Sequence, residues 1–202
     1  DRLHGGRLGK IVAIVAQHTT STLSGSAADN WRADPDEAPA GAMTAVGLHA
    51  LDLMIEFAGR VRDVQCLTGV HSEGPADDTT TVLMRFASGA TGAIFCSVAT
   101  ATNFSFAAYG SKGLAEVRGA SLQQFRFVPM STQAPSGPVL APPDETIEHA
   151  DFNMLRAELV EFARSIRDKR PYPISIDDVL HGMAVFDAAV ESAKTGRIVE
   201  IA

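Results

Sequence analysis

Short apolar runs alternate with turn-forming residues through most of the chain, a pattern typical of β-strands. Lys10–Thr20 (KIVAIVAQHTT) is rich in β-branched residues and is expected to form a buried strand. Two runs separated by Ala87-Ser-Gly-Ala90 predict a hairpin. The remaining strands are expected at Arg60–Ser72, Thr79–Phe86, Thr91–Val98, Phe104–Tyr109, Leu114–Val117, Leu122–Val128 and Arg197–Ile201.

The stretch Gly41–Gly59 (GAMTAVGLHALDLMIEFAG) has helical spacing and is apolar on nearly every side. Its polar residues form a thin stripe of His49, Asp52 and Glu56, which steps of three and four place on one helix face. A helix of this composition is expected to be buried. Each polar group on it then needs a partner or a function.

Two amphipathic helices are expected after a Pro-, Ser- and Gly-rich loop. The first, Phe152–Lys169, ends before Pro171. The second begins at the cap Ser175, buries a stripe of apolar residues and ends at Gly196. The apolar residues expected in the core are Leu155, Leu159, Phe162, Ile166, Val179, Met183, Phe186 and Val190.

Sequential strands followed by helices, without βαβ alternation, predict an α+β fold with an open, mostly antiparallel sheet and helices on one face. The length of 202 residues suits one domain, residues 1–202. Glycines with Leu3 and Leu8 at the start read as a helix end leading into a strand. This pattern suggests a piece of a longer protein.

Charge and composition exclude several classes of function. The net charge of −7 argues against a nucleic acid partner and against a polybasic membrane patch. No apolar run reaches the length of a membrane span. Cys66 and Cys96, both in apolar runs, are expected to be buried free thiols in a reducing compartment.

His49 is the strongest candidate for chemistry, because an imidazole can exchange a proton near pH 7. Two other interpretations compete: a core histidine satisfied by Asp52, and a metal site of the His-x-x-Asp type, although no second histidine cluster accompanies it. His18, at the end of the first strand, could approach the same site, but a strand-end histidine is more often at the surface. Trp31 and Arg32 either line a ligand site on a long loop, or plug a core edge and pair with Asp34 or Asp36.

Several segments together resemble the substrate domain of the Gfo/Idh/MocA oxidoreductases, which include glucose-fructose oxidoreductase and inositol dehydrogenase. These segments are the opening GGRLGKIV, Trp31-Arg32 followed by Gly41–Gly59, the turn in YGSKGLAEV, and the closing RPYPISIDDVLHGMAVFDAAVESAKTGRIVEI. The resemblance covers nearly the whole chain. It implies a C-terminal substrate-binding and oligomerisation domain of the dihydrodipicolinate-reductase-like type. The Rossmann domain that precedes it in the family is absent from this sequence.

The resemblance also implies a reaction and its participants. A hydride would pass between NAD or NADP, bound mainly by the other domain, and a sugar, polyol or related hydroxy compound. His49 matches the family's histidine, with Trp31, Arg32 and Asp52 as substrate-binding residues and no metal. Position 45 departs from the family, because Ala45 stands where many members have Asp. The protein is expected in the cytoplasm as a homodimer or homotetramer through the sheet face.

Other functions remain open. A non-catalytic binding or assembly module that keeps the fold is the main alternative, and Ala45 favours it. A metal-dependent lyase or hydrolase using His49 and Asp52 is a weaker one. This piece alone is expected to be inactive, because no Gly-rich phosphate-binding loop follows a strand.

Overall fold

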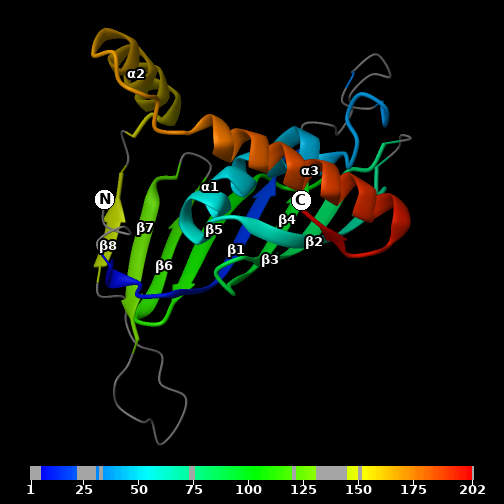
Figure 1. The fold of residues 1–202 in the computed structure, drawn as a ribbon, viewed down its shortest axis with the longest axis horizontal. Helices are drawn as coiled ribbons and strands as arrows, with labels where there is room; N and C mark the ends of the chain where they lie inside the picture. Colours follow the sequence, from blue (N-terminus) through cyan, green and yellow to red (C-terminus); the bar gives the residue numbers. More distant parts are fainter. Residues whose placement is uncertain are drawn as a thin grey trace, which may run out of the picture.

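The computed structural model describes residues 6–21, 31, 34–72, 76–119, 122–130, 145–149 and 152–201. Nine strands form one sheet in the order β8-β7-β6-β5-β1-β4-β3-β2-β9 (Figure 1). Their bounds are β1 Ile11–Thr19, β2 Val61–Gly69, β3 Thr79–Phe86, β4 Thr91–Ser97, β5 Asn103–Gly110, β6 Gly113–Arg118, β7 Gln124–Pro129, β8 Glu145–Glu148 and β9 Val199–Glu200.

Pairing in the sheet is antiparallel except between β1 and β4. The hairpin of β3 and β4 and the other expected strands are confirmed. The four-residue strand β8 was not predicted. The mixed α+β architecture with one open sheet matches the expectation from the sequence.

Helices lie on one face of the sheet. The π-helical turn η3 (Met43–Gly47) leads directly into α1 (Leu48–Ala58), and α3 (Ile176–Thr195) packs against α1 and β2. Gly59 ends α1 with a positive φ of 81°, and its amide donates a hydrogen bond to the Ile55 carbonyl. The helix α2 (Met154–Arg167) stands off the sheet near its β8 end, on the side of the other helices (Figure 1).

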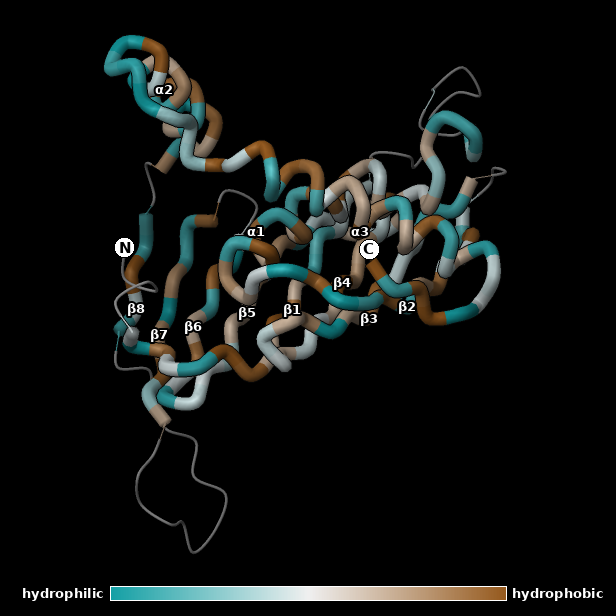
Figure 2. The backbone as a smooth tube through the Cα atoms, viewed as in Figure 1, coloured by the Kyte–Doolittle hydropathy of each residue, from teal (hydrophilic) through white to brown (hydrophobic). Residues whose placement is uncertain are grey.

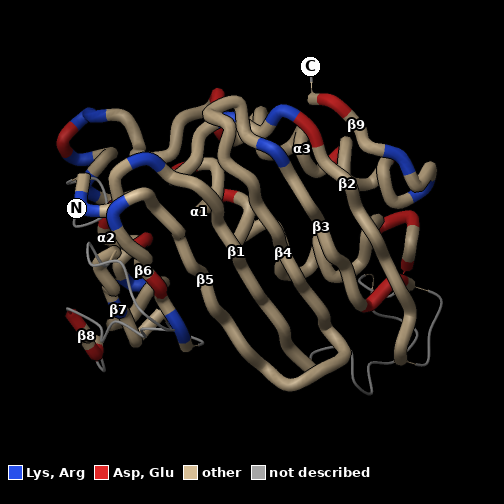
Figure 3. The backbone as a smooth tube through the Cα atoms, turned by 90° about the horizontal axis from the view of Figure 1, so that it is seen from below, with Lys and Arg blue, Asp and Glu red and all other residues tan. Residues whose placement is uncertain are grey.

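Alternation along the strands separates two faces. On β3 and β4, Val82, Met84 and Ile94 point to the helices and are buried in the main core. Thr81 and Ala93 lie on the opposite face, which none of the described helices covers and which we call the open face. Figure 3 views the molecule from this side. The central strands β5, β1 and β4 contain no charged residue.

The polar stripe of α1 is exposed, so the expectation that this helix is buried on all sides was wrong. Ala50, Leu51, Met54, Ile55 and Ala58 form its buried face. His49, Asp52 and Glu56 are classed as exposed and lie on the other side. The stripe is therefore available to a ligand or to another part of the protein.

The apolar face of α2 also differs from expectation. Leu155, Leu159, Phe162 and Ile166 are 55 to 64% exposed, so they form a surface on this chain and not a core. Figure 2 shows these apolar positions as brown segments on a helix that stands apart.

The last helix was predicted correctly in its limits but only partly in its buried face. Ser175 caps α3, with its hydroxyl accepting from the Asp178 amide at 3.0 Å. Phe186 is buried as expected, whereas Val179 and Met183 are 50% and 48% exposed.

The buried side of α3 includes several small residues, with Gly182 next to α1 and Ser192 next to β2. Their size lets α3 approach both elements closely. The Ser192 hydroxyl accepts from the amide of Cys66 at 2.9 Å.

Three buried residues have structural roles. His181 is buried on α3 and accepts a hydrogen bond from the Val61 amide through Nε2 at 2.8 Å. Cys66 and Cys96 are buried free thiols, as expected. Burial raises their pKa to about 11 and about 12, so both stay protonated and unreactive at neutral pH.

Candidate functional site

The exposed stripe of α1 meets the end of β1, and two histidines come together there. His18 lies one residue before the end of β1 and has the parity of Ile14 and Ala16, which face the helices. His49 lies in the first turn of α1. Their ring centroids are 6.0 Å apart and the ring planes are tilted by 44°.

The ring of His18 is held on two sides. Its Nδ1 lies 3.0 Å from the carbonyl oxygen of Val46 in η3. Its face meets Phe104 of β5 in a T-shaped contact at 5.2 Å between centroids. A carbonyl oxygen can only accept, so Nδ1 carries the proton and Nε2 of the neutral ring is an acceptor.

The surroundings keep His18 neutral. Burial lowers the pKa of His18 below its usual value, and the neighbouring His49 lowers it further. The Val46 carbonyl acts in the opposite direction, because it stabilises a protonated ring. The net direction is downward, so an unprotonated His18 is the main form at neutral pH.

Asp52 follows His49 on the polar stripe and lies beside α3. A methyl group at Gly182 would lie 3.6 Å from Oδ1 of Asp52. Burial raises the pKa of the Asp52 carboxyl, and His49 lowers it by a smaller amount. Asp52 therefore interacts with His49 through charge.

A groove runs from this carboxylate to the start of α3. It has a volume of about 210 Å³ and is lined by Asp52, Leu53, Ile55, Glu56, Pro173, Ile174 and Asp178. Its size and mixed lining, with three carboxylates and several apolar side chains, suit a small hydroxylated molecule better than an anion.

The site can hold and exchange protons with a small polar molecule. Two imidazoles supply both an acceptor and a donor for hydroxyl groups. Within the described ranges, no three His, Cys, Asp or Glu side chains are grouped as a metal ion would need. No helix in the same ranges is long and apolar enough to cross a bilayer.

The loop residues predicted to line the site are placed only in part. Trp31 is 50% exposed, so it does not plug a core edge, and its carbonyl accepts from the Asp34 amide at 3.1 Å. Arg32 lies outside the described residues. The roles given to Trp31, Arg32 and Asp52 stay predictions.

Sequence reasoning gave His18 too little weight. The alternation of side chains along β1 already puts His18 on the same side of the sheet as two buried residues. Ala45, one turn before His49, is partly buried against the core and offers no polar group. The polar neighbour of His49 comes from a strand, which helix spacing cannot reveal.

Solved structures with the same fold include several oxidoreductases. An NAD-binding oxidoreductase from Klebsiella pneumoniae aligns with a TM-score of 0.83 at 16% identity over 99% of this chain and 61% of its own. Levoglucosan dehydrogenase in complex with NADH and levoglucosan gives 0.83 at 17% identity over 98% and 60%. Aldose-aldose oxidoreductase from Caulobacter crescentus complexed with glycerol gives 0.77 at 22% identity over 98% and 58%.

These similarities show the fold. The chain spans only about three fifths of the length of these proteins, between 58 and 61%. No curated protein matches the sequence. A family model described as the GFO/IDH/MocA C-terminal domain matches residues 1–116, more than half of the chain. The chain therefore belongs to the Gfo/Idh/MocA family of oxidoreductases, as its C-terminal domain.

Proposed function

We propose that this chain is the substrate-binding and oligomerisation domain of an NAD(P)-dependent oxidoreductase. The enzyme would move a hydride between nicotinamide and a sugar, polyol or related hydroxy compound. The observation that carries the proposal is the exposed polar stripe of α1, where His49 lies beside His18 on an otherwise apolar helix. Family membership and structural neighbours that bind NADH or a sugar support it.

His49 has the position and chemistry to act on a substrate hydroxyl, as donor or acceptor of its proton. Trp31 and Arg32 would line the entrance, and Asp52 would orient the His49 ring. The nicotinamide, bound mainly by another domain, would accept the hydride. We place the protein in the cytoplasm, because both of its cysteines are free.

The apolar surfaces of α2 and of the first turns of α3 support a second domain. On α3 the exposed members include Ile176, Val179, Leu180 and Met183. The apolar face of α2 adds further exposed bulky side chains, of the kind that mark an interaction surface. Because the neighbours are longer proteins and levoglucosan dehydrogenase is solved with NADH, we propose that the nicotinamide-binding domain covers these side chains.

The test is oxidation by the full-length protein. D-Glucose, D-galactose, D-xylose, myo-inositol and levoglucosan are each supplied with NAD and with NADP, and the reduced nicotinamide is followed at its absorbance band. We expect at least one pair to be turned over with a kcat in the usual enzymatic range of about 1 s⁻¹ or more. No turnover with any pair would contradict the proposal.

A non-catalytic binding or assembly module is the second candidate, and Ala45 favours it. The position one turn before His49 has no side chain able to hydrogen-bond a substrate. In that case the same sugars would bind, as seen by calorimetry on the full-length protein, without reduction of the nicotinamide.

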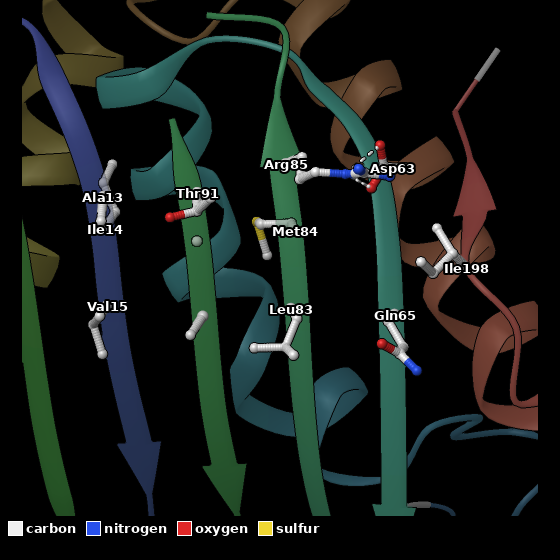
Figure 4. Close-up of a pocket in the computed structure, with 12 residues that line it drawn as sticks. Ala13, Ile14, Val15, Asp63, Gln65, Leu83, Met84, Arg85, Thr91 and Ile198 are labelled. Atoms are coloured by element: carbon white, nitrogen blue, oxygen red, sulfur yellow. Dashed lines mark hydrogen bonds and ion pairs between the residues drawn. The ribbon is translucent and has the colours of Figure 1, made fainter. Parts of the chain in front are cut away.

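We also propose that the open face joins two copies of this chain. Apolar side chains from the central strands are exposed on it: Val15, Leu67, Leu83, Phe95 and Tyr109. A depression of about 340 Å³ lies among Ala13, Val15, Leu83 and Ile198, and the Asp63–Arg85 ion pair borders it (Figure 4). A centre without charged residues is compatible with an identical surface, as a two-fold interface requires.

Replacing Leu83 by Glu is expected to convert the oligomer into monomers. The added carboxylate would be desolvated at the interface, at a cost of several kcal/mol for each copy. Sedimentation velocity of the full-length protein measures the outcome, with Lys194→Glu, an exposed change in the last turn of α3, as the control. A wild-type protein that sediments as a monomer at high concentration would contradict the proposal.

A further inference from the structure

His18 is fixed in one tautomer, and this determines what it can do for a ligand. The Val46 carbonyl lies 3.0 Å from Nδ1 and takes the single proton of the neutral ring. Nε2 is left with a lone pair. Towards any molecule between the two histidines, His18 can only accept.

The distance between the ring centroids is compatible with one oxygen atom bound by both histidines. A direct N–H···N bond of about 2.9 Å places two imidazole centres at most about 5.2 Å apart. The observed separation of the centroids is 6.0 Å, which is longer. Two ring nitrogens that share one hydroxyl oxygen, each at about 2.8 Å, give centres about 5 to 7 Å apart.

We propose that His18 is the proton acceptor of this site and that His49 donates a hydrogen bond to the same substrate oxygen. The inference rests on the proposed function and assigns the roles within it. A hydroxyl has one proton to give, and the fixed tautomer of His18 makes Nε2 its recipient. His49, whose ring has no such constraint, supplies the N–H.

The step balances with NAD(P) as the oxidant. The substrate C–H bond breaks and its electron pair leaves as hydride to the oxidised nicotinamide. The O–H bond breaks, its proton goes to Nε2 of His18, and the C=O bond forms. The protonated His18 is stabilised through Nδ1 by the Val46 carbonyl, as an oriented imidazolium requires.

Few other titratable groups face His18 among the described residues. His49 approaches from α1, and Asp52 lies one turn further along that helix. From the sheet, Cys96 of β4 pairs with His18 and Phe104 of β5 pairs on the other side. The Cys96 thiol stays neutral, because burial raises its pKa to about 12. Among these neighbours, neither Cys96 nor Phe104 can compete with His18 for a substrate proton.

The experiment compares His18→Ala and His49→Ala in the full-length enzyme, with the best substrate of the sugar panel. For the wild type, kcat/KM is expected to fall in acid because His18 becomes protonated, at a pH below the usual histidine range because the pKa of His18 is lowered. We call this fall the acidic limb. The His18→Ala variant should have a kcat/KM about 10²-fold lower than the wild type and should lack the acidic limb. Free imidazole added to this variant should restore part of its activity. The His49→Ala variant should also have a lower kcat/KM than the wild type but should keep the acidic limb.

The control is His149→Gln, an exposed histidine after β8, which should match the wild type. Loss of the limb in His49→Ala with its retention in His18→Ala would reverse the roles and overturn the proposal. Retention in both would assign the acceptor to another group and overturn it equally. In either case, turnover by the wild type would still support the proposed function. An inactive wild type would contradict both the proposed function and the roles assigned to the two histidines.

Discussion

Replacing His49 by Ala in the full-length protein is expected to lower kcat for alcohol oxidation about 10³-fold. The change removes the N–H that would hold the substrate oxygen as charge develops on it, a contribution of about 10² to 10³ in other enzymes. Folding should be almost unaffected, because His49 is exposed on α1 and Ala is the better helix former. Steady-state kinetics and thermal unfolding of the same samples measure the two effects.

Unequal effects on rate and stability are the essential result. A structural histidine would lose stability and activity together. If His49→Ala unfolds several degrees lower and kcat changes less than tenfold, the imidazole serves the fold and the catalytic assignment fails. His149→Gln again provides the control, since it removes an exposed histidine from another part of the chain.

Most strands could be read from the sequence because their side chains alternate between two environments. The β3–β4 hairpin is the clearest case, with Val82, Met84 and Ile94 buried and Thr81 and Ala93 on the open face. Strand β8 was missed because four residues with an exposed edge carry almost no alternation signal. The order of the strands was also out of reach, since β1 pairs with β4 and β5, which lie more than 70 residues away.

Helical spacing revealed which residues share a face but not what covers it. The apolar stripe of α2 was assigned to the core, yet on this chain it is exposed. On α3, Val179 and Met183 were expected to be buried but are exposed, whereas the small residues Gly182, Ala189 and Ser192 are buried. A prediction that uses hydrophobicity alone therefore does not select such small residues as buried.

The residues of the candidate site could likewise be predicted only in part from the sequence. His49 was identified from its place on an apolar helix. Its neighbour His18 is 31 positions earlier and comes close only through the sheet. The tautomer of His18 depends on the Val46 carbonyl in η3. The position of a backbone carbonyl cannot be inferred from residue types.

A second strong effect is expected at Asp78, a residue that no sequence pattern singled out. Its side chain is 0% exposed, just before β3. Oδ2 accepts hydrogen bonds from the amides of His71 and Ser72, at 2.7 and 2.6 Å, and from the Ser72 hydroxyl at 2.7 Å. The Thr79 hydroxyl donates to Oδ1 at 3.0 Å. This one carboxylate therefore closes the connection between β2 and β3.

The pKa of Asp78 shows that these bonds favour the charged form. Burial alone would raise the pKa, but the Ser72 hydroxyl, the two amides and the Thr79 hydroxyl outweigh it and lower the pKa below the usual value. A carboxyl whose pKa is lower in the folded state stabilises the fold above its unfolded pKa, about 3.9. That stability is lost as the pH falls through the folded value.

Replacing Asp78 by Asn should lower the free energy of unfolding by about 2 to 3 kcal/mol at pH 7, because an amide keeps the size but loses the charge and one acceptor. The difference between wild type and variant should shrink as the pH is lowered from 7 towards 3, since protonation removes the same charge from the wild type. Urea unfolding followed by circular dichroism measures both points, with the exposed change Asp187→Asn on α3 as the control. A difference that stays constant over this range would mean that packing, and not the charge of Asp78, holds the β2–β3 connection.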